Sequence, residues 1–320
     1  MTLHMTLRAV LIVALAAFVS GARAEDTLKV AIGQMEAWSN QPAQLGLHAG
    51  IFKKHGLALE NFGTAGAGET LQAVIAGAAD IGVGVGTVGA MRAFSKGAPV
   101  RIIGGSYTGV GDIYWYVKAD SPIKKLTDAT DKMTIAYSTN GSTSHSVVLA
   151  YGAELGVKAK PTSTGGLPST LTQVMSGQVD IGWGAPPFGL KEIEDGKIRI
   201  IAFGSDAPSL RNQTIRVVVA NAEALKARKD AIFRFARAYR ESINWMFSDP
   251  AATKYYAEQR HVPEPLVKQT ADKFQTKEGT QYDRIFGIDA IMGEGVKMKF
   301  LDRVLSPDEL AGLIQIPPVQ

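Results

Sequence analysis

The chain has 320 residues, of which 46% are hydrophobic and 20% are charged, and it contains no cysteine. The absence of cysteine excludes disulfides, thiolate metal sites, cysteine nucleophiles and a lipid anchor attached through a thiol. The 34 basic and 30 acidic residues are interspersed, without a long block of either sign. This balance argues against a nucleic acid as partner.

The first 24 residues have the three parts of a secretory signal. Arg8 gives a positive start, residues 9–19 form an apolar run, and Ala22 and Ala24 flank the middle position of a small-residue cleavage site. The run is far shorter than the roughly 20 residues that span a bilayer. We therefore expect a cleavable signal peptide over 1–24, a periplasmic protein, and a mature chain that begins at Glu25.

The mature chain predicts alternating strands and helices up to residue 220. The expected strands cover 27–33, 57–61, 100–104, 113–118, 133–137, 158–162, 198–203 and 214–219. The expected helices between them include 87–95, 142–155 and 187–194. Beyond residue 220 only helical patterns follow, at 222–247, 250–259, 263–274 and from Ser306. This order predicts an α/β fold with a helical C-terminal segment packed on it.

One pattern occurs twice, 100 residues apart. Its first copy comprises Leu71, Val74, Gly77, Asp80, Ile81, Gly82 and Gly84, and its second copy comprises Leu171, Val174, Gly177, Asp180, Ile181, Gly182 and Gly184. Each copy predicts a helix, a glycine stop and a strand, with the aspartate fixing the turn. A repeat of this length predicts two similar lobes with a ligand cleft between them. We place lobe one at 25–111 plus 218–320 and lobe two at 112–217, joined by two crossing segments that form a hinge.

The sequence offers no convincing catalytic constellation. The five histidines are scattered, no carboxylate cluster accompanies them, and the glycine-rich stretches lack the rest of a nucleotide-binding motif. We therefore expect no catalytic residue, no metal and no cofactor. Glycines 82, 84, 86, 104 and 105 are interpreted as places where the backbone comes close to a cleft.

The run Ser138-Thr139-Asn140-Gly141-Ser142-Thr143-Ser144 lies between a predicted strand and a predicted helix. A helix start exposes backbone N–H groups, so this run predicts an anion site, although ordinary helix capping is the alternative. Trp38 and Trp183 follow predicted strands and are candidate aromatic walls, although surface packing is an equal alternative for Trp38. Glu69 is better explained by complementing the helix dipole, and His145 by helix capping or core packing, so ligand contact by either one is left open.

Several segments together resemble the nitrate/sulfonate/taurine-type substrate-binding proteins of ABC importers. They are HAGIFKKHGL at 48–57, Gly77-Ala78-Ala79-Asp80, Gly141-Ser142, Gly177-Gln178-Val179-Asp180 and Ala185-Pro186-Pro187. The resemblance covers most of the mature chain. It implies a type II periplasmic binding protein fold, hinge closure on one small solute, delivery to a membrane permease, and a monomer.

The resemblance also carries pocket candidates onto this chain. They are Gln34, Trp38, Asn40, Gly68, Glu69, Thr70, Val85, Thr87, Asn140, Gly141, Ser142 and Thr143. Trp183 joins them because of its position after a predicted strand. No arginine is clearly placed to pair a sulfonate, since only Arg92 and Arg211 are candidates, but the aromatic residues favour a small organic anion. Two alternatives remain: an enzyme related to thiamine-pyrimidine or menaquinone synthesis, and a sensory binding protein without transport. The pyrimidine synthase has a cysteine-rich motif that this chain lacks.

Overall fold

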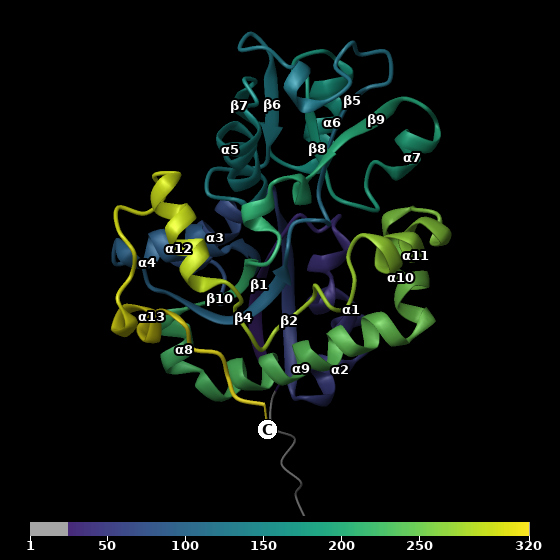
Figure 1. Cartoon of the computed structure of the whole chain (residues 1–320). Helices are drawn as coiled ribbons and strands as arrows, with labels where there is room; N and C mark the ends of the chain where they lie inside the picture. Colours follow the sequence, from purple (N-terminus) through teal and green to yellow (C-terminus); the bar gives the residue numbers. More distant parts are fainter. Residues whose placement is uncertain (1–24, 320) are drawn as a thin grey trace, which may run out of the picture.

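The structure is a computed structural model that describes residues 25–319, and it consists of two lobes (Figure 1). Lobe one contains a five-stranded sheet in the order β2-β1-β3-β10-β4. Its strands are β1 (Asp26–Gly33), β2 (Leu57–Thr64), β3 (Ile81–Gly86), β4 (Val100–Thr108) and β10 (Thr214–Asn221). β1 is parallel to β2 and β3, whereas β10 is antiparallel to β3 and β4.

Lobe two repeats this arrangement. Its strands are β5 (Tyr114–Lys118), β6 (Thr134–Tyr137), β7 (Lys160–Ser163), β8 (Gly182–Gly184) and β9 (Ile198–Phe203). The pair β6-β7 and the triplet β8-β5-β9 are joined by a parallel bridge between Ile135 and Ile181. The resulting order β7-β6-β8-β5-β9 matches that of lobe one, with β5 antiparallel like β10. The predicted duplication is confirmed.

Equivalent side chains make equivalent contacts in the two lobes. Asp80 Oδ2 accepts the backbone N–H of Lys29 at 2.8 Å, and Asp180 Oδ2 accepts that of Thr134 at 2.8 Å. The hydroxyls of Thr64 and Thr70 lie 2.7 Å apart, and those of Thr164 and Thr170 lie 2.6 Å apart. The two aspartates therefore fasten the strand after each repeated helix to the first strand of its lobe.

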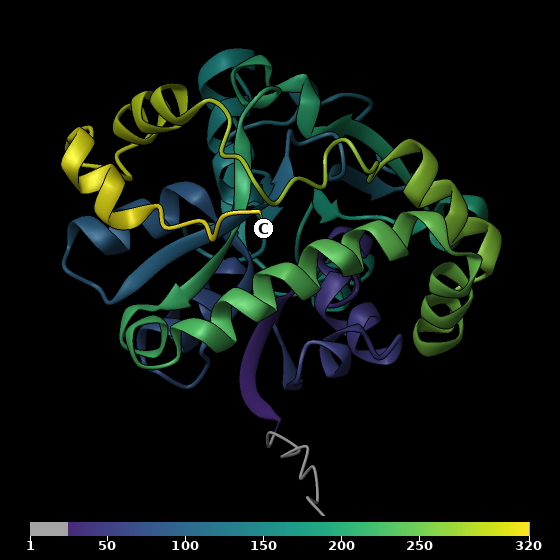
Figure 2. The ribbon, with the colours of Figure 1, turned by 90° about the horizontal axis from the view of Figure 1, so that it is seen from below.

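Helices cover both sheets. Those before residue 200 are α1 (Pro42–His48), α2 (Ile51–Lys54), α3 (Ala67–Ile75), α4 (Thr87–Ser95), α5 (Thr143–Leu155), α6 (Leu167–Met175) and α7 (Leu190–Glu194). The later ones are α8 (Ala222–Ala227), α9 (Lys229–Ser248), α10 (Pro250–Arg260), α11 (Glu264–Lys273), α12 (Ile288–Lys297) and α13 (Pro307–Leu313). Viewed from below, α9 runs across lobe one (Figure 2), and its buried face contacts α1 and α2. Among the described residues, no helix is long and apolar enough to cross a membrane.

Four expectations about the elements need correction. The helix expected over 222–247 is broken at Arg228, whose backbone leaves the helical region and whose guanidinium pairs with Asp80. The helix expected from 187 starts at Leu190, after Gly189 in a left-handed conformation. α12 was not expected at all. β10 begins at Thr214, so residues 214–217 lie in the first sheet although the sequence boundary assigns them to lobe two.

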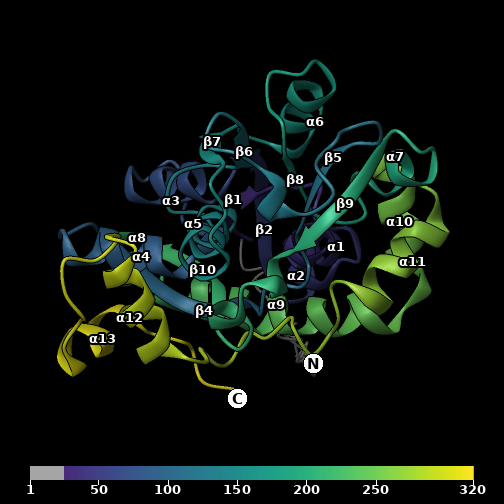
Figure 3. The same cartoon turned by 45° about the horizontal axis from the view of Figure 1, so that its top comes forward.

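The lobes are joined by two short crossings, after β4 at residues 109–113 and before β10 at residues 204–213. Tilting the molecule forward shows lobe two over lobe one, with the C-terminal helices on two sides (Figure 3). Lobe two has its own core around Trp115 and Tyr151, and lobe one has cores on both faces of its sheet. The surfaces that face each other across the crossings hold the candidate site.

Candidate functional site

A cavity lies between the lobes, and both lobes line it. The space between its lining atoms is about 390 Å³, part of which is open solvent at its mouth. Lobe one contributes Gln34, Ala37, Asn40, Ala67, Gly84 and Arg216, the first crossing contributes Ile113, and lobe two contributes Ser138, Ser142, Thr143, Ser144, Trp183 and Ala185. Cavities of this kind, apolar with a few convergent polar groups, are typical small-molecule sites.

The start of α5 forms the polar wall of lobe two. Ser142 is the N-cap, and its hydroxyl accepts the backbone N–H of His145 at 3.2 Å. The Ser144 hydroxyl lies 3.1 Å from the hydroxyls of both Ser138 and Ser142. A helix start with a hydroxyl cluster presents donors and a partial positive charge, which suit an acidic group. The sequence singled out this wall because its residues all fall within the run 138–144.

Arg216 is the charged residue among those that line the cavity. It lies on β10, it is 6% exposed, and its guanidinium carbon is 4.7 Å above the ring of Tyr107. Its Nη2 pairs with the carboxylate of Asp112, a fully buried residue of the first crossing. Burial raises the pKa of Asp112, while the adjacent guanidinium opposes that rise. The aromatic ring and the carboxylate therefore hold the guanidinium in place.

Three residues of the wall carry buried polar atoms without a hydrogen-bond partner among the described residues. They are the indole Nε1 of Trp183, the guanidinium Nε of Arg216 and the Oδ1 of Asn40. Trp183 and Asn40 are each 3% exposed. Buried donors and acceptors are nearly always paired, since an unpaired one costs free energy. Within this cavity, these atoms are therefore available as donors and an acceptor.

Five of the thirteen predicted site residues line this cavity. They are Gln34, Asn40, Ser142, Thr143 and Trp183. Gly68, Glu69 and Thr70 lie in the first turn of α3 beside it, where Glu69 accepts the N–H of Ala65 and Thr70 is bonded to Thr64. Asn140 is exposed and accepts a hydrogen bond from the Tyr137 hydroxyl at 2.8 Å. Gly141 follows with a positive φ of 76°.

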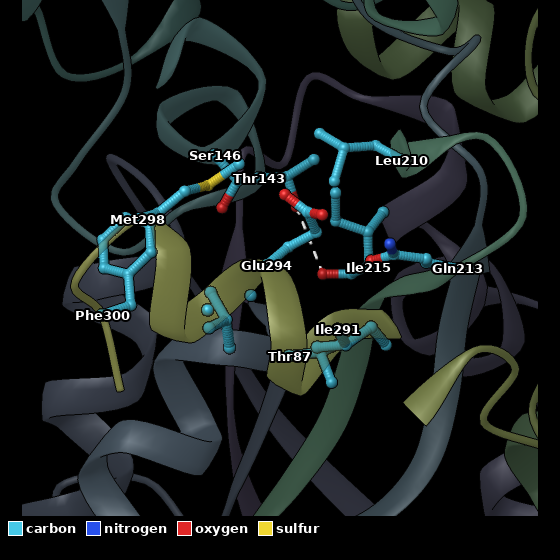
Figure 4. A pocket seen from close by; sticks show the side chains of 13 residues that line it. Thr87, Thr143, Ser146, Leu210, Gln213, Ile215, Ile291, Glu294, Met298 and Phe300 are labelled. Atoms are coloured by element: carbon cyan, nitrogen blue, oxygen red, sulfur yellow. Dashed lines mark hydrogen bonds between the residues drawn. The ribbon is translucent and has the colours of Figure 1, made fainter. Parts of the chain in front are cut away.

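The remaining three lie elsewhere. Trp38 is fully buried against Phe247 and Tyr256, because the short 3-10 helix Trp38–Asn40 turns its ring toward α10. Val85 points into the core of lobe one. Thr87 lines a second cavity behind Thr143, beside α12 (Figure 4). There the Thr143 hydroxyl donates to the carbonyl of Ile215 at 3.4 Å, so Thr143 separates the two cavities.

Sequence reasoning missed Arg216. The predicted candidates, Arg92 and Arg211, lie outside the cavity lining, and Arg211 donates to the carbonyl of Ser205. The available signal was a single arginine within the otherwise uncharged run Thr214–Asn221, in a strand whose residues are all buried. Of the glycines interpreted as lying near a cleft, Gly84 and Gly86 do face the cleft region. Gly82, Gly104 and Gly105 instead pack within lobe one, against Val74, Tyr282 and Gln281 respectively. No group of potential metal ligands occurs in the described part of the chain.

The family model described as NMT1/THI5 like matches residues 42–253. The chain belongs to this family. The solved structures similar to the NMT1/THI5-like chain are mostly binding proteins associated with transport. The alkanesulfonate-binding protein SsuA of Xanthomonas axonopodis pv. citri, bound to MOPS, is 16% identical, with a TM-score of 0.73 over 91% of this chain and 98% of that one.

Two further structures agree. The aliphatic sulphonate-binding SsuA of Escherichia coli is 17% identical, with a TM-score of 0.69 over 92% of this chain and 93% of that one. The nitrate-binding NrtA of Synechocystis PCC 6803 is 15% identical, with a TM-score of 0.69 over 90% of this chain and 84% of that one. No curated protein matches the sequence. At these identities the likeness establishes the fold, which is that of periplasmic binding proteins.

Proposed function

We propose that this NMT1/THI5-like protein is the solute-binding component of an ABC importer, and that it captures a small organic acid between its lobes. The supporting observation is the cavity wall, where the unpaired Nε of Arg216 and the unpaired indole N–H of Trp183 accompany the start of α5. A carboxylate or sulfonate accepts from all of these donors. The proposal includes a periplasmic location, a membrane permease as partner, a monomeric state and no catalytic activity.

Each part of the proposed acid has a place in the cavity. The guanidinium of Arg216 and the N-terminal turn of α5 receive the acidic group, and the indole of Trp183 covers an organic part that a small inorganic anion would lack. The carboxylate of Asp112 does not appear in the cavity wall, because it lies behind Arg216 and fixes its orientation. The proposed solute therefore contacts the unpaired Nε of a guanidinium that Asp112 already holds in place.

The test is thermal unfolding of the mature protein against carboxylates, alkanesulfonates, nitrate and pyrimidines, each acid being paired with its neutral amide. A ligand that binds only the native state stabilises it by about 2.7 kcal/mol at a hundredfold excess over Kd, which shifts Tm by several degrees. We expect at least one organic acid to raise Tm while its amide does not. A response to neutral compounds alone contradicts capture of an acid.

Trp183→Phe tests whether the solute occupies this cavity. The substitution keeps an aromatic face but deletes the N–H, so we expect affinity to fall roughly fivefold with little change in solute-free stability. The matched control is Trp245→Phe, because Trp245 lies on α9 and its indole donates to Asp249 at 2.9 Å. Equal affinities for both variants and the wild type place the solute elsewhere.

A further inference from the structure

Two side chains reach across the cleft to the start of a helix in the opposite lobe. The Oε1 of Gln34, in lobe one, accepts the backbone N–H of Leu167, the first residue of α6, at 3.3 Å. The Oγ1 of Thr139, in lobe two, accepts the backbone N–H of Gly68, in the first turn of α3, at 2.9 Å. Helix starts have unpaired N–H groups, and here each lobe pairs one of the other's.

Gln34 and Thr139 occupy equivalent positions in the duplicated fold. Lys29 in β1 and Thr134 in β6 are equivalent residues, because each donates its backbone N–H to the aspartate of the repeat, Asp80 or Asp180. Gln34 and Thr139 each lie five residues after them. The helices they reach, α3 and α6, are the two copies of the repeated unit. The contacts are therefore reciprocal, and the same geometry joins the lobes twice.

Gln34 is held for this contact. Its backbone has a φ of 51°, which is uncommon outside glycine, and its side chain is buried. Its Nε2 donates to the carbonyl of Ala65, in the loop that precedes α3. The amide thus links the loop of lobe one to the helix of lobe two.

Beside Thr139, the backbone of residues 139–141 lies directly on glycines of lobe one. A Cβ at Gly86 would lie 2.5 Å from the carbonyl oxygen of Gly141, and one at Gly89 would lie 3.0 Å from the same atom. A Cβ at Gly68 would lie 3.0 Å from the carbonyl oxygen of Asn140. Gly86 has an ordinary φ of −63°, so its lack of a side chain serves the contact between the lobes and not its own backbone.

We propose that Gln34, Thr139 and these glycines form a closure latch that sets how tightly the cleft holds its solute. The proposal rests on the proposed function for the identity of that solute, but the latch itself consists of contacts between the two lobes. Each contact exists only when the lobes are together, so weakening it favours the open form and speeds release. Affinity falls because the solute must supply more of the free energy of closure.

Thr139→Val and Gly86→Ala test the latch. Thr139→Val deletes one acceptor outside the cavity lining, and we expect roughly 3- to 10-fold weaker binding. Gly86→Ala places a methyl group against Gly141, and we expect roughly 10- to 100-fold weaker binding through faster dissociation. The control is Gly293→Ala on α12, because no atom lies within 4 Å of the added methyl group. Gln34 is avoided as a test position because it also lines the cavity.

Lobe separation is measured independently of any solute. The chain has no cysteine, so Gln72→Cys on α3 and Thr172→Cys on α6, both exposed, accept a pair of spin labels. We expect the distance distributions of Thr139→Val and Gly86→Ala to contain more of the long distances than those of the wild type and Gly293→Ala. Identical distributions in all four proteins, with and without each acid, overturn the latch. If no acid binds but the distributions still differ, the latch stands and the proposed function fails.

Discussion

His145 lies at the boundary between the lobes and is neutral at neutral pH. Its ring stacks on Tyr137 at 4.1 Å, meets the edge of Phe300 at 5.2 Å, and accepts the N–H of Gly141 on Nδ1 at 3.2 Å. Burial lowers the pKa of His145 from 6.5 to about 4. The neutral ring can accept the hydrogen bond that shapes the turn at Gly141, whereas a doubly protonated ring cannot.

This lowered pKa predicts a specific loss of stability in acid. Between pH 6.5 and about 4 the unfolded chain binds the proton and the folded chain does not, so the free energy of unfolding falls as the pH falls through this window. Above pH 6.5 both states are neutral and the effect vanishes. We expect the Tm of the wild type, relative to that of His145→Gln, to be lower at pH 4.5 than at pH 7. Exposed His261→Asn is the control, and a constant difference for His145→Gln contradicts the prediction.

Among the elements, the repeated helix–turn–strand unit depends on its aspartate. Asp180 accepts both the N–H and the hydroxyl of Thr134, while Asp80 accepts the N–H of Lys29 and pairs with Arg228. Both lie at the far end of the strands from the cavity wall. Their role is thus to hold β3 against β1 and β8 against β6.

We expect Asp80→Ala and Asp180→Ala each to lower the free energy of unfolding by about 1 to 2 kcal/mol, since each removes two polar contacts. Solute affinity should remain within about twofold of the wild type, because neither residue touches the cavity. Denaturant unfolding combined with a binding titration checks both parts. A large loss of affinity at unchanged stability would show that these turns belong to the site.

The way the elements pair explains which parts of the site the sequence could predict. The start of α5 and the loop at Gln34 were predicted because each directly follows a strand in the sequence. Their identification as loops after strands does not depend on the order of the strands in the sheet. Arg216 was missed because its position depends on β10 returning from lobe two to insert between β3 and β4. Trp38 was misplaced for a related reason: the direction of its ring is decided by packing against α10, more than 200 residues later. Local sequence patterns do not show which distant elements pack against each other.

At the scale of the whole molecule, the proposed solute site depends on how the two lobes come together. The cavity wall is divided between the lobes, with Arg216 in lobe one and the start of α5 in lobe two, so under the proposed function both contact the solute only when the lobes are together. The C-terminal segment adds contacts of its own, since the buried amide of Gln275 donates to the carbonyl of Pro186 at 2.8 Å and Phe274 stacks on Phe203. The segment that follows α11 therefore also contacts lobe two.

We predict the location of the whole molecule from its first residues. The predicted signal peptide 1–24 lies outside the described residues, and β1 begins at Asp26. Cleavage after Ala24 would leave one residue, Glu25, ahead of the first strand. We expect intact-mass measurement of the periplasmic fraction of a Gram-negative host to give a chain that starts at Glu25. Replacing Ala22 and Ala24 by leucine should block cleavage and leave the precursor with the membranes, because the peptidase needs small residues there. A mature chain that starts inside β1, or one that stays in the cytoplasm, contradicts the prediction.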